Sequence, residues 1–405
     1  MKRLLLVSVL VSAFASTADT QGSPQDYPQW RGRNGDGAAS AFIPPKTWPK
    51  TLTRRWRIDV GEGYGTPLVV ADTVYVFTRR DDNEVMTAVD AATGAARWRS
   101  AYPAPYKPSD PTVAHGSGPK ATPLSHEGKL FTVGISGIVS AFEAKSGKRL
   151  WQTSAPDETP YFSAASSPVG TKGLVIVHPG NYGPLTAFDA NTGTVKWTAG
   201  AGGFFMSPLI VTLAGTAQVV SVTQSGVIGV SLDAGLVLWE YQWSGGGMGG
   251  TMPVVYGDTV IVSASRNGVA AFKPSKRDGR WVTETVWQTG DVSMYLSNPV
   301  VIGDALFGLS QRSSGEYFAL DARTGKVLWL GQPRQATNTA VVKADDLLFL
   351  LNDDAELIVA RANRARFEPI TQYTVADSAT WAQPAISGNR IFIKDVTSLS
   401  LWTID

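Results

Sequence analysis

DANTGTVKW, residues 189–197, decides the fold, because close copies of it recur along the chain. The copies read DAATGAARW at 90–98, EAKSGKRLW at 143–151 and DARTGKVLW at 321–329. A motif used four times in register indicates a repeated structural unit rather than a single active site.

The tryptophan that ends the motif sets the period of the repeat. Tryptophans in this position follow one another at intervals of about 40 to 50 residues, at Trp56, Trp98, Trp151, Trp197, Trp239, Trp287 and Trp329. A period of this length built from short strands is typical of a β-propeller blade. We predict that these tryptophans are structural and dock each blade against its neighbour.

Each period contains the same four strands. In the third period they are SSPV (166–169), VIVH (175–178), LTAFD (185–189) and the strand that carries Trp197. The first three kinds occur eight times each, and no segment shows a sustained helical period. The eighth unit lacks an outer strand, whereas TRRWRID at 53–59 is an outer strand with no blade before it. We therefore predict an all-β, eight-bladed β-propeller of four-stranded antiparallel blades, closed by the N-terminal strand.

The chemistry of the motif suits a turn followed by a docking strand. Its aspartate can accept hydrogen bonds from the amides of the turn, and its glycine suits a positive φ. The indole N–H needs an acceptor in the neighbouring blade. Three units depart from the pattern: 233–239 looks shortened, 273–287 forms an extended hairpin, and the seventh lacks both glycine and tryptophan.

The ends of the chain differ from the repeats. Residues 1–15 combine a basic head, an apolar run and Ala13-Phe14-Ala15, which predicts a signal peptide and an exported, periplasmic or extracellular protein. Residues 16–52 form an N-terminal extension, and 53–405 form one propeller domain. No later stretch has the roughly 20 apolar residues of a transmembrane helix.

Composition excludes several classes of function. Outside the leader, which contains Lys2 and Arg3, basic and acidic residues are equal in number, so nothing favours nucleic acid as a partner. The chain has no cysteine, and therefore no disulfide, thiol nucleophile, thiolate metal site or lipid-bearing cysteine. The three histidines show no metal-ligand spacing, and the acidic pairs, Asp353-Asp354 among them, fall at hairpin turns. We expect no metal site and no catalytic residue.

The phrase A-x-D-A-x-T-G-x-x-x-W, as in residues 187–197, resembles the tryptophan-docking repeat of the quinoprotein-like eight-bladed propellers. The resemblance extends over residues 53–405 and covers two branches. One branch contains dehydrogenases that bind pyrroloquinoline quinone (PQQ) with calcium. The other contains BamB, a non-enzymatic propeller of the outer-membrane assembly machinery, and similar exported proteins.

The resemblance favours the non-catalytic branch. The dehydrogenases typically have longer chains and place adjacent cysteines against the quinone, and their calcium ligands and catalytic aspartate have no aligned counterpart here. The chain also lacks the lipid-bearing cysteine of BamB. The resemblance thus implies a monomeric protein-binding or assembly scaffold for envelope or secreted proteins, including extended polypeptides, without a cofactor. The alternative is a PQQ- and calcium-dependent alcohol or sugar dehydrogenase, and a carbohydrate-binding propeller is a third reading.

The candidate ligand site is the mouth of the central channel. The fold brings together there the segments that precede the eight inner strands, at 63–65, 114–121, 160–165, 202–206, 245–252, 292–296, 335–338 and 377–382. Their aromatic and methionine side chains would suit a flat ligand or an extended peptide: Tyr64, Tyr161, Phe162, Phe204, Phe205, Met206, Met248, Met294, Tyr295 and Trp381. The alternative is that these side chains only fill a tapering funnel. The proline-rich loop at 100–120 could be a lid, a docking edge or a plain spacer.

Overall fold

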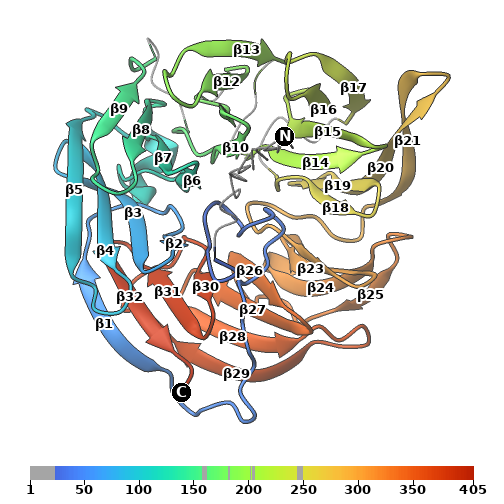
Figure 1. Ribbon diagram of the computed structural model, residues 1–405. Helices are drawn as coiled ribbons and strands as arrows, with labels where there is room; N and C mark the ends of the chain where they lie inside the picture. The colour runs from blue at the N-terminus through green and yellow to red at the C-terminus, as the bar shows by residue number, and fades with distance from the viewer. Residues whose placement is uncertain (1–22, 157–161, 181–182, 201, 203–205, 244–249) are drawn as a thin grey trace, which may run out of the picture.

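Eight four-stranded antiparallel sheets form a closed ring around a central axis (Figure 1). The structure is a computed structural model, and it describes residues 23–156, 162–180, 183–200, 202, 206–243 and 250–405. The predicted signal peptide lies outside these residues. No helix of the described residues has both the length and the apolar character needed to cross a membrane.

The first four blades follow one another along the chain, each with its strands ordered from the axis outward. Their strands are β2 (Leu68–Val70), β3 (Thr73–Arg80), β4 (Asn83–Asp90) and β5 (Ala96–Pro103); β6 (Leu124–His126), β7 (Lys129–Val133), β8 (Val139–Glu143) and β9 (Arg149–Gln152); β10 (Val169–Thr171), β11 (Leu174–Val177), β12 (Leu185–Asp189) and β13 (Val195–Ala199); and β14 (Leu209–Leu213), β15 (Thr216–Val222), β16 (Gly226–Ser231) and β17 (Val237–Gln242).

The next three blades repeat this order. Their strands are β18 (Val254–Tyr256), β19 (Thr259–Ala264), β20 (Gly268–Arg277) and β21 (Arg280–Thr289); β22 (Val300–Ile302), β23 (Ala305–Ser310), β24 (Glu316–Asp321) and β25 (Val327–Leu330); and β26 (Thr339–Ala344), β27 (Leu347–Asn352), β28 (Glu356–Arg361) and β29 (Glu368–Thr374). Two short 3-10 helices, η1 (Asp110–His115) and η3 (Arg312–Ser314), lie between strands.

The eighth blade combines both ends of the described chain, as predicted. It contains β30 (Ala385–Ser387), β31 (Arg390–Lys394) and β32 (Ser398–Thr403), and its outer strand is β1 (Thr53–Asp59). The two outermost strands pair antiparallel, from Thr53 opposite Thr403 to Asp59 opposite Ser398. This pairing turns an open array of sheets into a ring.

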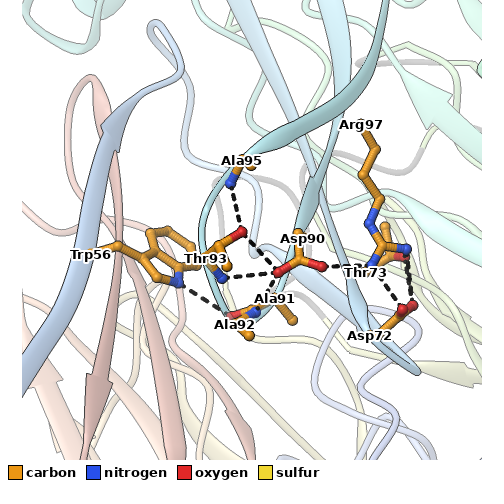
Figure 2. A network of polar contacts seen from close by, with 9 residues as sticks. All are labelled: Trp56, Asp72, Thr73, Asp90, Ala91, Ala92, Thr93, Ala95 and Arg97. Atoms are coloured by element: carbon orange, nitrogen blue, oxygen red, sulfur yellow. Dashed lines mark hydrogen bonds and ion pairs between the residues drawn. The ribbon is translucent and has the colours of Figure 1, made fainter.

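In the blades that carry it, the aspartate of the repeated motif organises the turn before the outer strand, as Figure 2 shows for Asp90. Its Oδ1 accepts hydrogen bonds from the amides of Ala92 and Thr93, at 3.1 and 2.9 Å. Its Oδ2 accepts a 2.7 Å bond from Arg97. These bonds, that from Arg97 foremost, lower the pKa of Asp90 to about 2. The carboxylate therefore stays ionised and holds the turn throughout the physiological pH range.

Six of the seven motif tryptophans bind the turn of the next blade around the ring. The indole of Trp56 donates to the carbonyl oxygen of Ala91, directly after Asp90 (Figure 2). The other five acceptors are the carbonyl oxygens of Ala144 for Trp98, Ala190 for Trp151, Leu232 for Trp197, Ala322 for Trp287 and Asn363 for Trp329, at 2.8–3.2 Å. Each complete motif therefore accepts a hydrogen bond from the indole of the preceding blade, and its own tryptophan donates one to the next blade.

The motif glycine has two functions in this contact. Gly325 has φ +72°, and a Cβ on it would lie 2.4 Å from the ring of Trp287. Gly94, Gly147, Gly193 and Gly235 have the same relation to the tryptophan of the blade before. Glycine is thus required both by the turn and by the indole that covers it.

We expect Gly325→Ala to destabilise the protein by about 2 kcal/mol, because it adds a displaced indole to the roughly 1 kcal/mol of a positive φ. Gly257→Ala is the matched control: φ is +57° there and no atom lies within 4 Å of the added Cβ. Urea unfolding of both variants measures the difference. Equal losses of stability would show that the indole contact contributes nothing.

The fourth blade corrects one sequence interpretation. Its turn is not shortened: Gly235 donates to the carbonyl of Ser231 as Gly193 donates to that of Asp189, so Ser231 occupies the aspartate position. The fifth blade has the predicted long hairpin, β20–β21, in place of a tight turn. Trp239, which faces this hairpin, donates to Oε1 of Gln218 in its own blade instead.

The joint between blades seven and eight uses different residues. Thr371 stands opposite Val359, in the register position that Trp329 takes opposite Ala319. Side chains of the N-terminal extension enter the apolar cluster of this joint, among them Leu52 and the partly buried Trp48. The indole of Trp48 therefore packs into a joint whose outer strand has Thr371 in place of the motif tryptophan.

Residues 27–40, the axial segment, run across the axis inside the ring (Figure 1). Tyr27 exchanges two backbone hydrogen bonds with Val69 of β2, at 2.7 and 3.0 Å. Ala38 bridges Lys343 of β26, and Ser40 bridges Ser387 of β30. The axial segment thus joins inner strands from opposite parts of the chain.

Candidate functional site

A central cavity of about 430 Å³ lies on the propeller axis. Residues from the segments before all eight inner strands line it, as the sequence predicted for the channel mouth. Trp30 and Arg31 of the axial segment line it as well, and Trp30 also borders a second cavity of about 290 Å³. The axial segment therefore divides the channel and makes the central cavity a pocket.

The structure brings together five of the predicted ligand-binding residues. Tyr64, Phe162, Met206, Tyr295 and Trp381 all line the central cavity. Met294 does not line it: this side chain is fully buried between blades five and six, because its neighbour Tyr295 takes the place at the cavity wall. Tyr161, Phe204, Phe205 and Met248 lie outside the described residues.

Aromatic rings form one side of the cavity. The imidazole of His115 lies edge-on to Trp381, with ring centroids 4.9 Å apart, and edge-on to Tyr64 at 6.4 Å. His115 ends helix η1, so the proline-rich loop at 100–120 contributes to the cavity wall and is more than a spacer. Burial, reinforced by the charge of Lys120, holds the pKa of His115 below its usual value. The imidazole is therefore neutral at pH 7.

Lys120 is the amine of the cavity wall, at the end of the same loop. Desolvation by burial lowers the pKa of its ammonium group to about 8. Among the described residues no side chain forms a hydrogen bond or an ion pair with this amine. Lys120 is thus a partly desolvated cation with free donor capacity beside aromatic rings.

Arg31 is the buried cation of the axial segment. Its guanidinium donates to the carbonyl oxygens of Gly35 and Asn298, both at 3.3 Å, and of Pro299 at 2.5 Å. Burial lowers the pKa of Arg31 to about 10, so that it remains charged at physiological pH. Its hydrogen bonds fix the axial segment against blade six.

Asp353 is the one acidic residue among the described residues that line the cavity, and one of its oxygens already accepts a hydrogen bond from the backbone amide of Asn338, at 3.0 Å. Ca²⁺ takes six to eight oxygen ligands, carboxylates prominent among them. In the described part of the chain no group of three or more His, Cys, Asp or Glu side chains is placed to hold a metal ion. The donor set of the described residues therefore does not fit PQQ with calcium.

The most buried histidine lies away from the cavity. His178 contacts Ser221 through Nε2, at 2.7 Å, and the carbonyl of Gly183 through Nδ1, at 3.2 Å. Burial lowers the pKa of His178 to about 4. It is a neutral, hydrogen-bonded residue that joins blades three and four.

Sequence reasoning missed the charged groups of the cavity. Lys120 and His115 lie in the segment 114–121, which is predicted at the mouth. The candidate ligand-binding residues were the aromatic residues and methionines of these segments, and that criterion does not select a lysine or a histidine. The position of Asp353 in a hairpin turn predicts no ligand site, yet the β27–β28 turn opens on the same face as the segments before the inner strands, and Asp353 lines the cavity. Successive strands of a blade run in opposite directions, so the sequence alone could have placed that turn at the mouth.

A family model described as "Outer membrane protein assembly factor BamB" matches residues 49–113 and 81–330. BamB of Shewanella oneidensis is 26% identical over 308 residues, which are 75% of this chain and 66% of that protein. The dehydrogenase subunit of a quinone-dependent alcohol dehydrogenase of Komagataeibacter europaeus is 32% identical over 175 residues, 39% of this chain and 22% of that protein. These matches span less than two thirds of either relative.

The crystal structure of BamB from Moraxella catarrhalis is similar in fold, with a TM-score of 0.64. The superposition covers 87% of this chain and 98% of that one, at 16% sequence identity. At this identity the similarity is one of fold alone.

Proposed function

Since this chain belongs to the family described as outer membrane protein assembly factor BamB, we propose that it is an exported, non-catalytic propeller that binds envelope proteins as an assembly scaffold. Such a scaffold needs surfaces that bind a partner chain without catalysing a reaction. The ring offers them at the outer edges of its blades.

The observation that carries the proposal is a set of exposed apolar side chains on the outer strands of blades two to six. The outer strand of each of these five consecutive blades carries one large apolar residue that is between 40% and 55% exposed: Leu150, Val195, Val237, Val286 and Leu330. Each of these strands pairs only on its inner side within its own sheet. An edge strand with free backbone groups and apolar side chains can add an extended segment of another protein.

Site-specific photo-cross-linking in the native host tests this proposal. A photoreactive residue in place of Val195 in β13 is expected to capture envelope proteins several-fold more often than one in place of Ala96 in β5. The control is matched, because both residues are exposed and follow the motif glycine by two positions. Equal capture at the two positions would exclude the edge of blade three as the docking surface.

Titration with PQQ and Ca²⁺ distinguishes the alternative function. The purified protein is expected to show no dye-linked oxidation of alcohols or sugars in their presence. Tight binding of PQQ with turnover would overturn the scaffold proposal in favour of a quinoprotein dehydrogenase.

A further inference from the structure

The central cavity has the composition of a small-molecule site. Its volume of about 430 Å³ lies within the usual range of roughly 300–1,000 Å³ for ligand pockets. Aromatic rings of Tyr64, Phe162, Tyr295 and Trp381 line it beside a few polar groups. Flat rings of this kind favour a flat, apolar ligand.

The charges of the cavity favour an anion. Among the described lining residues Arg31 and Lys120 carry positive charge at pH 7 and His115 can acquire one at lower pH, against the single carboxylate of Asp353. Arg31 already donates to three carbonyl oxygens, and its charge is held in place by the axial segment. Lys120 alone combines a positive charge with donors that the described residues leave free.

Desolvation makes the amine of Lys120 costly to keep charged without a partner. Burial lowers its pKa to about 8, and among the groups facing it His115 is neutral at pH 7. An anion within the cavity would compensate this cost, because a charge pair is stronger where water is excluded.

We infer that the central cavity binds a small, flat, hydrophobic carboxylate whose carboxylate group pairs with Lys120 while its rings lie among Tyr64, Tyr295 and Trp381. The site is independent of the blade edges that carry the proposed scaffold function. It requires no metal ion, and a single ammonium group supplies its charge.

Isothermal titration with 2-naphthoate and with its neutral isostere 2-naphthamide tests the inference. At pH 7 the protein is expected to bind the carboxylate at least tenfold more tightly than the amide. The preference should decline above about pH 8, because the ammonium of Lys120 loses its proton there while the ligand stays ionised. Equal affinities, or no binding of either probe at millimolar concentration, would overturn it.

Lys120→Met is the decisive variant, and Lys145→Met, at an exposed lysine of the β8–β9 turn, is its matched control. Lys120→Met should bind the two probes within twofold of each other, whereas Lys145→Met should keep the wild-type preference. A thermal unfolding midpoint at or above that of the wild type shows that Lys120→Met folds, since it removes a desolvated charge. A retained preference in Lys120→Met would refute the role of Lys120.

The source of the carboxylate is tested in the same titration. A short peptide that ends in tryptophan presents a carboxylate beside an aromatic ring, but its chain must leave through the mouth of the cavity. Weaker binding of this peptide than of 2-naphthoate supports a free small molecule as the ligand. Tighter binding would overturn that assignment in favour of a polypeptide end.

Discussion

Replacing Trp287 with alanine should lower the free energy of unfolding by about 3–5 kcal/mol. The indole is 8% exposed, donates to the carbonyl of Ala322 at 3.0 Å and covers Gly325. Its loss leaves a cavity between blades five and six and a carbonyl group without its partner. Because these contacts join two blades, the loss weakens the ring rather than one sheet. Chemical unfolding followed by circular dichroism measures the effect.

Two further variants test why Trp287→Ala loses stability. Trp287→Phe keeps most of the apolar contact and removes the N–H donor, so it should cost clearly less than alanine. Trp281→Ala is the control on the same strand, because Trp281 lies in the long hairpin, where Lys276 covers its ring and it packs at the edge of the cluster of blades four and five rather than against blade six. A loss below about 1 kcal/mol for Trp287→Ala would refute the docking role of the motif tryptophan.

Arg31→Met should also cost about 3–5 kcal/mol, although it preserves the apolar stem of the side chain. The guanidinium is fully buried, and its removal leaves the carbonyl oxygens of Gly35, Asn298 and Pro299 without these donors. Each unsatisfied buried acceptor costs roughly 1–3 kcal/mol. We expect in addition that proteases cleave the axial segment of the folded variant faster than that of the wild type.

Arg33→Met provides the comparison from the same segment. Its side chain is 40% exposed and lies 3.9 Å from Asp26, so the variant should lose less than about 1 kcal/mol. Similar losses for both variants would mean that the axial segment is held by its backbone bridges alone. Urea unfolding of the two proteins decides this point.

Much of the fold could be predicted because it repeats. The spacing of the tryptophans predicted a propeller, and the eightfold recurrence of the first three strands predicted eight blades. TRRWRID at 53–59 predicted the closing strand, which pairs with β32. The turn of blade four escaped recognition because Ser231 replaces aspartate, and the backbone bond from Gly235 rather than a residue type defines that turn. A repeated motif predicts the geometry of a turn, but a substitution at one of its positions makes the same turn difficult to recognise from the sequence.

The cavity could be predicted only in part. The propeller fold brings the segments before the inner strands to the mouth and so predicted the place of Tyr64, Phe162, Tyr295 and Trp381, and all four line the cavity. The axial segment could not be placed, because its course depends on bridges to strands more than 300 residues away in the case of β26 and β30. Such contacts leave no local period in the sequence.

The pairing of β1 with β32 also bears on the order of folding. Arg55 of β1 bonds to Asp405, about 350 residues along the chain, whereas strands within the other seven blades pair through short hairpins. Contacts so distant in sequence form slowly, since the entropy of closing a long loop must be overcome before they stabilise the chain. The seven hairpin-built blades can therefore form early, while the eighth closes last. Until that step the chain exposes strand edges that the ring later covers, and this interval is its period of greatest exposure to aggregation.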